Sequence, residues 1–193
     1  MAGDKRTDRH YFRVIDVGGD EMRRMVLPVL AVALMGCSGQ PEPSEETVTP
    51  TPEITVPAMP ELAADDSPAG AEAFARHYIE VLNYSALTGD TAELENLSAD
   101  DCTGCAKYIE LYRSTYQNGG FFTGGEWTVE AVALNSRNST HEVTADISAS
   151  AGSSKKSATD TEIENAAYQE RVFLEVSRGG DRWIAQRLGR PEE

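Results

Sequence analysis

The sequence predicts an α+β fold in which three helices are followed by four antiparallel strands. Apolar residues between Ser67 and Gln117 recur at the spacing of amphipathic helices. From Trp127 onward, apolar and polar residues alternate, as they do in strands with one buried face. Because the helices precede the strands instead of alternating with them, the order is that of an α+β domain.

The first two predicted helices have clear end signals. Ser67 is a suitable N-cap with Pro68 at the first helical position, and Gly89 ends the first helix. In the short second helix, Asp90 and Glu93 are spaced as in a capping box. The apolar face of the first helix is predicted to consist of Phe74, Tyr78 and Leu82, with Ala71, Ala75 and Ile79 beside them.

The predicted strands differ in how strongly the sequence marks them. Residues 152–164 are mostly polar, which predicts a loop between the second and third strands. Gly179 and Gly180 mark a hairpin turn before the last strand, "RWIAQRL". The expected inward-facing residues of the first two strands are Trp127, Val129, Ala131 and Ala133, and Val143, Ala145 and Ile147. In the third strand one face carries Tyr168, Glu170, Val172, Leu174 and Val176.

The N-terminal region contains a short apolar run that ends at a cysteine. Met25–Gly36 has twelve residues, fewer than the roughly 20 that a membrane-spanning helix needs. Two arginines precede this run, and "LMGC" ends it at Cys37. A basic region followed by a short apolar region is typical of a secretory signal peptide. The "LMGC" stretch resembles the lipobox of bacterial lipoproteins, which implies cleavage before Cys37 and a lipid on its sulfur.

We predict residues 1–36 to be the signal peptide region. Within it, residues 1–21 mix both signs of charge and match no part of a signal peptide. We therefore hypothesise that Met22 or Met25 is the initiator and that the upstream stretch is an extension of the gene model. Without residues 1–36 the chain has 11 basic and 27 acidic residues, a net charge of −16. An acidic surface of this kind argues against nucleic acid as a partner.

Residues 37–66 are predicted to be a disordered linker between Cys37 and a single domain at 67–193. Ser38–Asp66 contains six prolines, seven acidic residues and no basic residue. Such a segment buries too little apolar surface to offset its ordering entropy. We expect it to be an extended spacer that holds the domain away from the membrane.

The predicted domain resembles the nuclear transport factor 2-like (cystatin-like) cone, with three helices packed on a curved four-stranded sheet. The closing "GGDRWIAQRL" carries most of this likeness. More narrowly, the chain from Met59 onward is similar to an uncharacterised family of actinobacterial lipoproteins without assigned activity. The residues that match this family's pattern are Met59, Pro60, Glu61, Asn83, Tyr84, Asp101, Cys102, Cys105, Gly124, Gly125 and Trp127.

Cys102 and Cys105 lie at the start of the third predicted helix, 101–117, whose inner face also includes Tyr108, Ile109, Tyr112 and Tyr116. Residues three apart in a helical turn are within disulfide range, and an exported protein meets an oxidising environment. A structural disulfide is therefore the favoured interpretation. A redox pair is the alternative, because a thiol at a helix N-terminus has a lowered pKa. Two sulfurs without an evident set of further ligands make a poor zinc site, so no metal is predicted.

An enzyme would need an acid or base inside the cone. Glu170 shares a strand face with apolar residues. Tyr78, Tyr112 and His77 lie on helices that could line the same cavity, and Trp127 could lie at its rim. The competing interpretation is that Glu170 is solvated near a strand end, that the tyrosines are core residues with their hydroxyls at the rim, and that His77 lies at the core boundary. Neither a catalytic residue nor a cofactor is assigned.

Three functions remain from the sequence. The preferred one is a lipid-anchored lipoprotein on the extracytoplasmic face of the cell membrane, with a non-catalytic domain that binds an unidentified envelope protein or small ligand. The second is a small-molecule enzyme of the isomerase or dehydratase type in the cone. The third is a thiol-disulfide redox protein that uses Cys102 and Cys105. The oligomeric state is not predicted.

Overall fold

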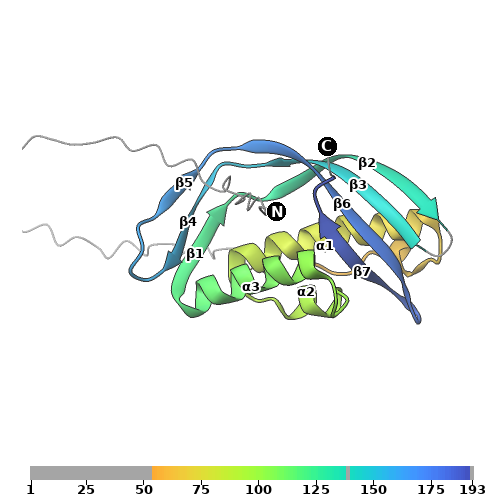
Figure 1. Cartoon of the computed structure of the whole chain (residues 1–193), viewed down its shortest axis with the longest axis horizontal. Helices are drawn as coiled ribbons and strands as arrows, with labels where there is room; N and C mark the ends of the chain where they lie inside the picture. Colours follow the sequence, from red (N-terminus) through yellow and green to blue (C-terminus); the bar gives the residue numbers. More distant parts are fainter. Residues whose placement is uncertain (1–53, 138–139, 192–193) are drawn as a thin grey trace, which may run out of the picture. The chain divides into compact units, whose positions relative to one another are not determined.

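Helices precede strands in the computed structural model, which describes residues 54–137 and 140–191 (Figure 1). The signal region, Cys37 and the linker up to residue 53 lie outside the described residues. The elements are η1 (Glu61–Ala64), α1 (Pro68–Thr88), α2 (Ala92–Asn96), α3 (Thr103–Gln117), β1 (Gly119–Gly124), β2 (Trp127–Arg137), β3 (Thr140–Ala149), β4 (Gly152–Ser157), β5 (Ile163–Asn165), β6 (Tyr168–Gly179) and β7 (Arg182–Gly189). The α+β class predicted from the sequence is confirmed. No helix among the described residues is long and apolar enough to cross a membrane.

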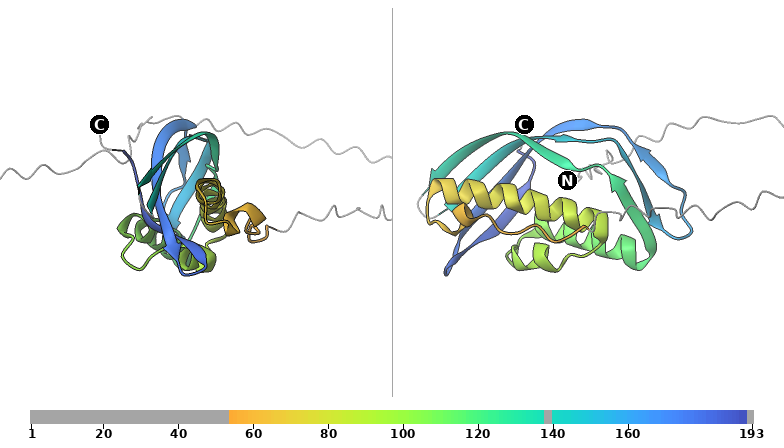
Figure 2. Two further views of the ribbon diagram at one scale, coloured as in Figure 1. Left: turned by 90° about the vertical axis from the view of Figure 1, so that its right-hand side faces the viewer. Right: turned by 180° about the vertical axis from the view of Figure 1, so that it is seen from behind.

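The strands form two antiparallel sheets, one of four strands in the order β2-β3-β6-β7 and one of three in the order β1-β4-β5. Helix α1 contacts all four strands of the larger sheet, and α3 contacts β7 and the strands β1 and β4. Both helices therefore cover the same side of the strands, as the two views of Figure 2 show. The prediction of a single four-stranded sheet was wrong, because β1, β4 and β5 make a second one.

Strand β4 occupies the polar stretch that the sequence predicted to be a loop. Its serines are buried but bonded: the Ser153 hydroxyl lies 2.9 Å from that of Thr123 on β1 and donates to Glu162 at 2.5 Å. Asn165 on β5 donates to the Ser154 hydroxyl at 3.1 Å. Hydroxyl pairing across strands thus replaces apolar burial. An alternation of apolar and polar residues therefore could not reveal this sheet.

A β-bulge in β2 reverses which of its residues face the core. Val129 pairs with Ile147, but Ala131 pairs with Asp146, so the register shifts between them. Beyond the bulge Val132 and Leu134 pack against the core, whereas the alanines at 131 and 133 are exposed. The prediction that Ala131 and Ala133 point inward was therefore wrong. An extra residue inverts the two-residue period.

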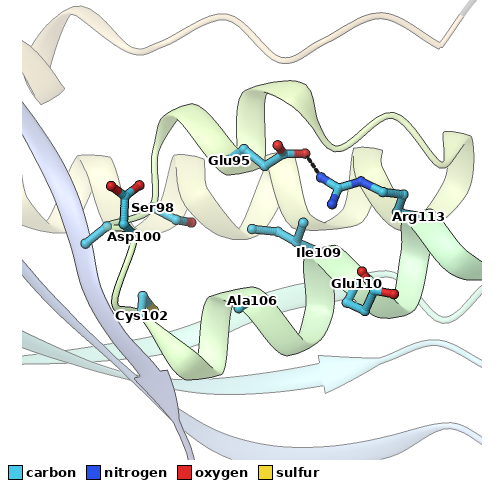
Figure 3. Close-up of a pocket in the computed structure, with 9 residues that line it drawn as sticks. Glu95, Ser98, Asp100, Cys102, Ala106, Ile109, Glu110 and Arg113 are labelled. Atoms are coloured by element: carbon cyan, nitrogen blue, oxygen red, sulfur yellow. Dashed lines mark hydrogen bonds and ion pairs between the residues drawn. The ribbon is translucent and has the colours of Figure 1, made fainter.

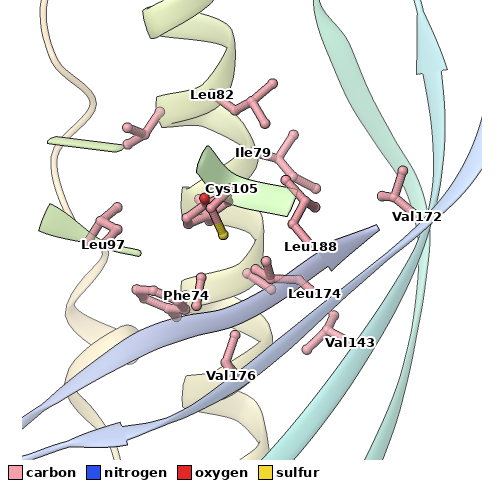
Figure 4. Close-up of a cluster of buried hydrophobic side chains, with 14 of the residues drawn as sticks. Phe74, Ile79, Leu82, Leu97, Cys105, Val143, Val172, Leu174, Val176 and Leu188 are labelled. Carbon is pink, nitrogen blue, oxygen red and sulfur yellow. The ribbon is translucent and has the colours of Figure 1, made fainter. Parts of the chain in front are cut away.

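The core lies between α1, α3 and the inner face of the larger sheet (Figure 4). Phe74, Tyr78 and Leu82 of α1 are each at most 1% exposed, as predicted. The predicted caps of α1 are also present, because the Ser67 hydroxyl accepts from the Gly70 N–H at 3.1 Å and Gly89 adopts φ 74°. The core includes, from other elements, Leu97, Cys105, Val143, Val172, Leu174, Val176, Trp183 and Leu188.

The predicted capping box of α2 is absent. Thr91, not Asp90, is the N-cap residue, and Asp90 Oδ1 instead accepts from the N–H of Ala92 at 3.0 Å. The Glu93 carboxylate accepts from the side chain of Asn96 at 3.3 Å. The boundary moved by one residue because Asp90 forms its own local turn.

Residues 61–65, which we call the strap, pack against the start of α1 and against β7. Ala63 is only 5% exposed. The indole N–H of Trp183 donates to the Asp65 carbonyl at 3.1 Å, and the Arg178 guanidinium donates to the Ala64 carbonyl at 3.4 Å. Packed structure therefore begins at residue 61. The sequence analysis had predicted that the domain starts later, at Ser67.

Candidate functional site

Tyr78 links two parts of the helical layer and is fully buried. Its hydroxyl lies 2.8 Å from that of Ser98, which also donates to the Leu94 carbonyl at 2.7 Å. Burial raises the pKa of Tyr78 to about 12, although the hydrogen bond with Ser98 opposes the shift. A neutral, hydrogen-bonded tyrosine at this position joins α1 to the segment after α2 and is not exposed to a ligand.

Tyr112 and Trp127 lie in one aromatic cluster, to which Tyr108 and Phe122 also belong. The Tyr112 ring meets Phe122 edge to face at 5.5 Å, and Tyr108 meets Trp127 in the same way at 5.7 Å. Tyr112 is 6% exposed and Trp127 is 8% exposed. Burial, reinforced by the neighbouring Tyr108, raises the pKa of Tyr112. Both residues are thus packing elements of the core.

Asn83 on α1 holds the start of β2 by pairing with the backbone of Trp127. Its side-chain amide donates to the Trp127 carbonyl and accepts from the Trp127 N–H, both at 2.9 Å. The next residue, Tyr84, donates to Asp90 Oδ2 at 2.9 Å. The Asn-Tyr pair of the family-like pattern therefore has a structural role in this chain, because Asn83 holds β2 and Tyr84 holds the turn after α1.

Glu170 lies on the core face of β6, as predicted, with its side chain 14% exposed. Its carboxylate forms a bidentate ion pair with the Arg190 guanidinium. In one of the two contacts, Arg190 Nη2 lies 2.9 Å from Glu170 Oε2. Glu170 would have to release Arg190 before it could accept a proton from a substrate. The structure does not bring it together with Tyr78, whose hydroxyl is bonded to Ser98.

His77 is buried at 1% exposure, so the prediction that it lies at the core boundary was wrong. Its Nδ1 has no hydrogen-bond partner within the described part of the chain, and the Glu80 carboxylate is 3.9 Å away. Burial lowers the pKa of His77, while the charges of Glu80 and Glu93 oppose this shift. A neutral imidazole is the form that this site favours.

A disulfide joins Cys102 to Cys105 at the start of α3, as the sequence predicted. Each cysteine is 1% exposed, and both belong to the core. Close packing continues at Gly104, where a Cβ atom would lie 1.8 Å from the Leu188 carbonyl on β7. Within the residues that the structure covers, no group of His, Cys, Asp and Glu is arranged to hold a metal ion.

A groove between α2 and α3 was not predicted from the sequence (Figure 3). It has a volume of about 330 Å³ and lies over the disulfide. Its wall on the α2 side includes an ion pair between Glu95 and Arg113, and hydrogen bonds from Thr91 and Arg113 lower the pKa of Glu95. The lining residues are Glu95, Ser98, Ala99, Asp100, Cys102, Ala106, Ile109, Glu110 and Arg113.

A second hollow of about 490 Å³ lies on the opposite, outward face of β3, β6 and β7. Phe173 and Arg187 line it, with the guanidinium carbon 5.2 Å from the ring centre. Arg187 also approaches Glu175 at 3.5 Å. Arg187 and Arg190 of this hollow are thus paired within the domain, with Glu175 and Glu170 respectively.

Several solved structures match this chain over part of its length. The intermembrane-space region of the chloroplast protein ARC6 has 12% sequence identity, with a TM-score of 0.46 over 64% of this chain and 95% of its own. An NTF2-like protein with a cystatin-like fold from Novosphingobium aromaticivorans has 14% identity, with a TM-score of 0.38 over 61% of this chain and 78% of its own.

Comparison with sequences assigns the chain to a family. No curated protein matches it. A family model described as a family of unknown function, DUF6318, matches residues 45–188, and this region includes every element from η1 to β6 and nearly all of β7. The sequence-based resemblance to a family without assigned activity is thus confirmed, and the chain belongs to the DUF6318 family of unknown function.

Proposed function

We propose that the protein is a lipoprotein held on the extracytoplasmic face of the cell membrane through Cys37, and that its domain is a non-catalytic interaction domain. The buried disulfide between Cys102 and Cys105 carries this proposal. Disulfides form and persist in oxidising compartments and are rare in the cytosol. The pair therefore supports export, which agrees with the signal-like run before Cys37.

The interior of the domain supports an interaction role over catalysis. The residues that could have formed a catalytic centre have structural partners: Tyr78 is bonded to Ser98, and Glu170 is paired with Arg190. The disulfide also fits a structural role better than a redox role. Both sulfurs belong to core residues at 1% exposure, whereas a thiol exchanging with a substrate protein must be reached by it.

The anchor is tested by replacing Cys37 with serine in cells and following the protein by membrane fractionation. Two or more acyl chains make anchoring stable, so the wild-type protein should sediment with membranes. The Cys37→Ser protein should instead be released or accumulate as an uncleaved precursor. An unchanged membrane fraction for Cys37→Ser would refute the lipid anchor.

The interaction role is tested by cross-linking the anchored wild-type protein in intact cells and identifying the products by mass spectrometry. A discrete partner band that disappears when residues 67–193 are deleted supports the proposal. The deletion is the control for contacts made by the anchor and linker alone. A turnover activity of the purified domain toward small molecules, with no such partner, would overturn the proposal in favour of an enzyme.

A further inference from the structure

Strand β2 forms one edge of the larger sheet (Figure 1). Strand β3 pairs with one side of β2, and no strand among the described residues pairs with the other side. Within residues 54–137 and 140–191, the backbone of Ala131–Asn135 is hydrogen-bonded to β3 alone. Because alternate backbone groups of an edge strand point away from its partner, this stretch presents free N–H and C=O groups.

The other sheet edges in the described part of the chain are covered, short or rich in glycine. The outer edge of β7 is bonded to the loop after α2 at 2.9 Å, from Ala99 N–H to the Ala185 carbonyl and from Ala185 N–H to the Leu97 carbonyl. Strand β5 has three residues, one of which is Glu164, and β1 has the sequence "GGFFTG". Covering segments, short strands and charges are the usual means by which proteins keep sheet edges from pairing.

The two halves of β2 differ in this protection. The first half contains the bulge between Val129 and Ala131 and the carboxylate of Glu130, which accepts from the Ser148 hydroxyl at 2.5 Å. The second half, from Ala131 to Ser136, reads "AVALNS" and has no charged residue, although 25% of the residues in the whole chain are charged. The second half of β2 is therefore an open edge without the features that normally prevent strand pairing.

This uncharged stretch is complementary to a second copy of itself in the antiparallel direction. With a two-fold axis at Ala133, Ala133 faces its own copy, and the other pairs are Val132 with Leu134 and Ala131 with Asn135. Val132 and Leu134 are half-buried and already pack against the core, so their pairing would extend the apolar layer across the axis. The alanines and Asn135 are exposed on the other face, where no like charges would stand opposite each other.

We propose that the protein forms a two-fold symmetric dimer in which β2 pairs with β2 of a second copy, centred on Ala133. The pairing joins two four-stranded sheets into one continuous sheet. A second copy is favoured over an unrelated extended peptide because one stretch supplies matching side chains on both sides of the axis. The contact is short, which places the dimer in the weak class of interfaces. Anchoring both copies to one membrane through Cys37, as proposed, would raise their effective concentration.

The first test is analytical ultracentrifugation of protein comprising residues 38–193, from micromolar to millimolar concentration. The wild-type protein should pass from monomer to dimer as its concentration rises. Ala133→Lys places two ammonium groups opposite each other at the axis and should raise the Kd of the dimer about tenfold or more. Thr128→Lys is the matched control, because it adds the same charge to an exposed position of β2 before the bulge and should leave the Kd unchanged. A wild-type protein that stays monomeric, or equal weakening by both variants, would contradict the proposal.

The register of the pairing is tested with single cysteines and a short thiol-specific cross-linker. Ala133→Cys should form a covalent dimer by itself, because this position faces its own copy. Ala131→Cys and Asn135→Cys should cross-link efficiently when the two proteins are mixed, and far less when either is alone. Efficient cross-linking of Ala131→Cys alone, or equal cross-linking at all three positions, would overturn the pairing centred on Ala133.

Cross-linking of the full-length chain in cells distinguishes a second copy from another partner. A covalent band at twice the mass for Ala133→Cys, absent for Thr128→Cys, supports the dimer. A band that contains a different protein, with no dimer, would show that the β2 edge binds a partner strand and would overturn the proposal. The purified protein lacks Cys37, so failure of the dimer and failure of the lipid anchor appear in different experiments.

Discussion

Gly70 provides the sharpest test of how the strap is attached to the domain. It lies in the first turn of α1, where a Cβ atom would be 2.1 Å from the Asp65 carbonyl oxygen and 3.1 Å from the Leu62 carbonyl oxygen. These are backbone atoms, so neither can rotate away as a side chain would. Replacing Gly70 with alanine must therefore displace the strap.

The expected magnitude follows from two opposing effects. Glycine to alanine in a helix normally stabilises by up to about 1 kcal/mol. Displacing the strap removes the acceptor of the Trp183 indole, which is 1% exposed, and an unpaired buried donor costs about 1–3 kcal/mol. Exposing the methyl group of Ala63 adds about 0.8 kcal/mol. We expect Gly70→Ala to lower the free energy of unfolding by about 1–3 kcal/mol.

The assay is urea unfolding of Gly70→Ala in two chain lengths, residues 38–193 and residues 67–193. Removing the strap should itself destabilise the wild-type domain, because Trp183 loses its acceptor and Ala63 its contacts. In the shorter chain the clash is gone, so Gly70→Ala should become neutral or stabilising. Gly104→Ala is the control, because its clash is with Leu188 and should destabilise both lengths. Equal destabilisation by Gly70→Ala in both lengths would refute the reasoning.

Three further predictions concern the interior. Burial lowers the pKa of His77, so on acidification the unfolded chain takes up the proton first, and the free energy of unfolding should fall as the pH drops below about 6.5. His77→Gln should make the free energy of unfolding in urea depend less on pH between pH 7 and 5. An unchanged pH dependence would contradict this. Joint replacement of Cys102 and Cys105 by serine should cost about 2 kcal/mol, the loop-entropy value for so short a ring, and reduction of the wild-type protein should shift its urea midpoint the same way. Asn83→Ala should cost about 2 kcal/mol in thermal unfolding by leaving Trp127 backbone groups unpaired, and a change below 0.5 kcal/mol would count against the clamp.

The features that the sequence predicted well are those encoded by neighbouring residues. The ends of α1 follow from Ser67, Pro68 and Gly89, whose capping chemistry acts within one helical turn. The strand β6 follows from the alternation around Val172 and Leu174, because its ladder with β3 is regular along its whole length. These signals need no knowledge of the rest of the fold.

The features that were missed depend on residues far apart in the chain. The polar strand β4 exists because Ser153 meets Thr123 and Glu162, which no local pattern reveals. The bulge in β2 is visible only in its pairing with β3, although the larger side chains of Val132 and Leu134 hint at it. The strap has an acidic residue at each end and follows Pro60, and its partner Trp183 lies 118 residues along the chain from Asp65.

In the candidate site, too, the features encoded by neighbouring residues were predictable and those that depend on distant residues were not. The Cys102–Cys105 pair was predictable because its spacing matches one helical turn. The interpretation of Glu170 was incomplete because its partner, Arg190, comes from the chain terminus. The groove was missed because its walls are the charged faces of two helices, which in the sequence read as ordinary solvent-exposed surface. The acidic stretch "SADD" was its only local signal.

The strap has a mechanical consequence if Cys37 is anchored as proposed. Tension along the linker would enter the domain through residues 61–65 before it reached α1. The strap is held by the bonds from Trp183 and Arg178, by the buried methyl of Ala63 and by its packing on the first turn of α1. The strap would therefore detach while α1 and the sheets stayed folded. Detachment of the strap would expose the indole of Trp183. Pulling on the anchor would therefore change the fluorescence of Trp183 before the domain unfolds.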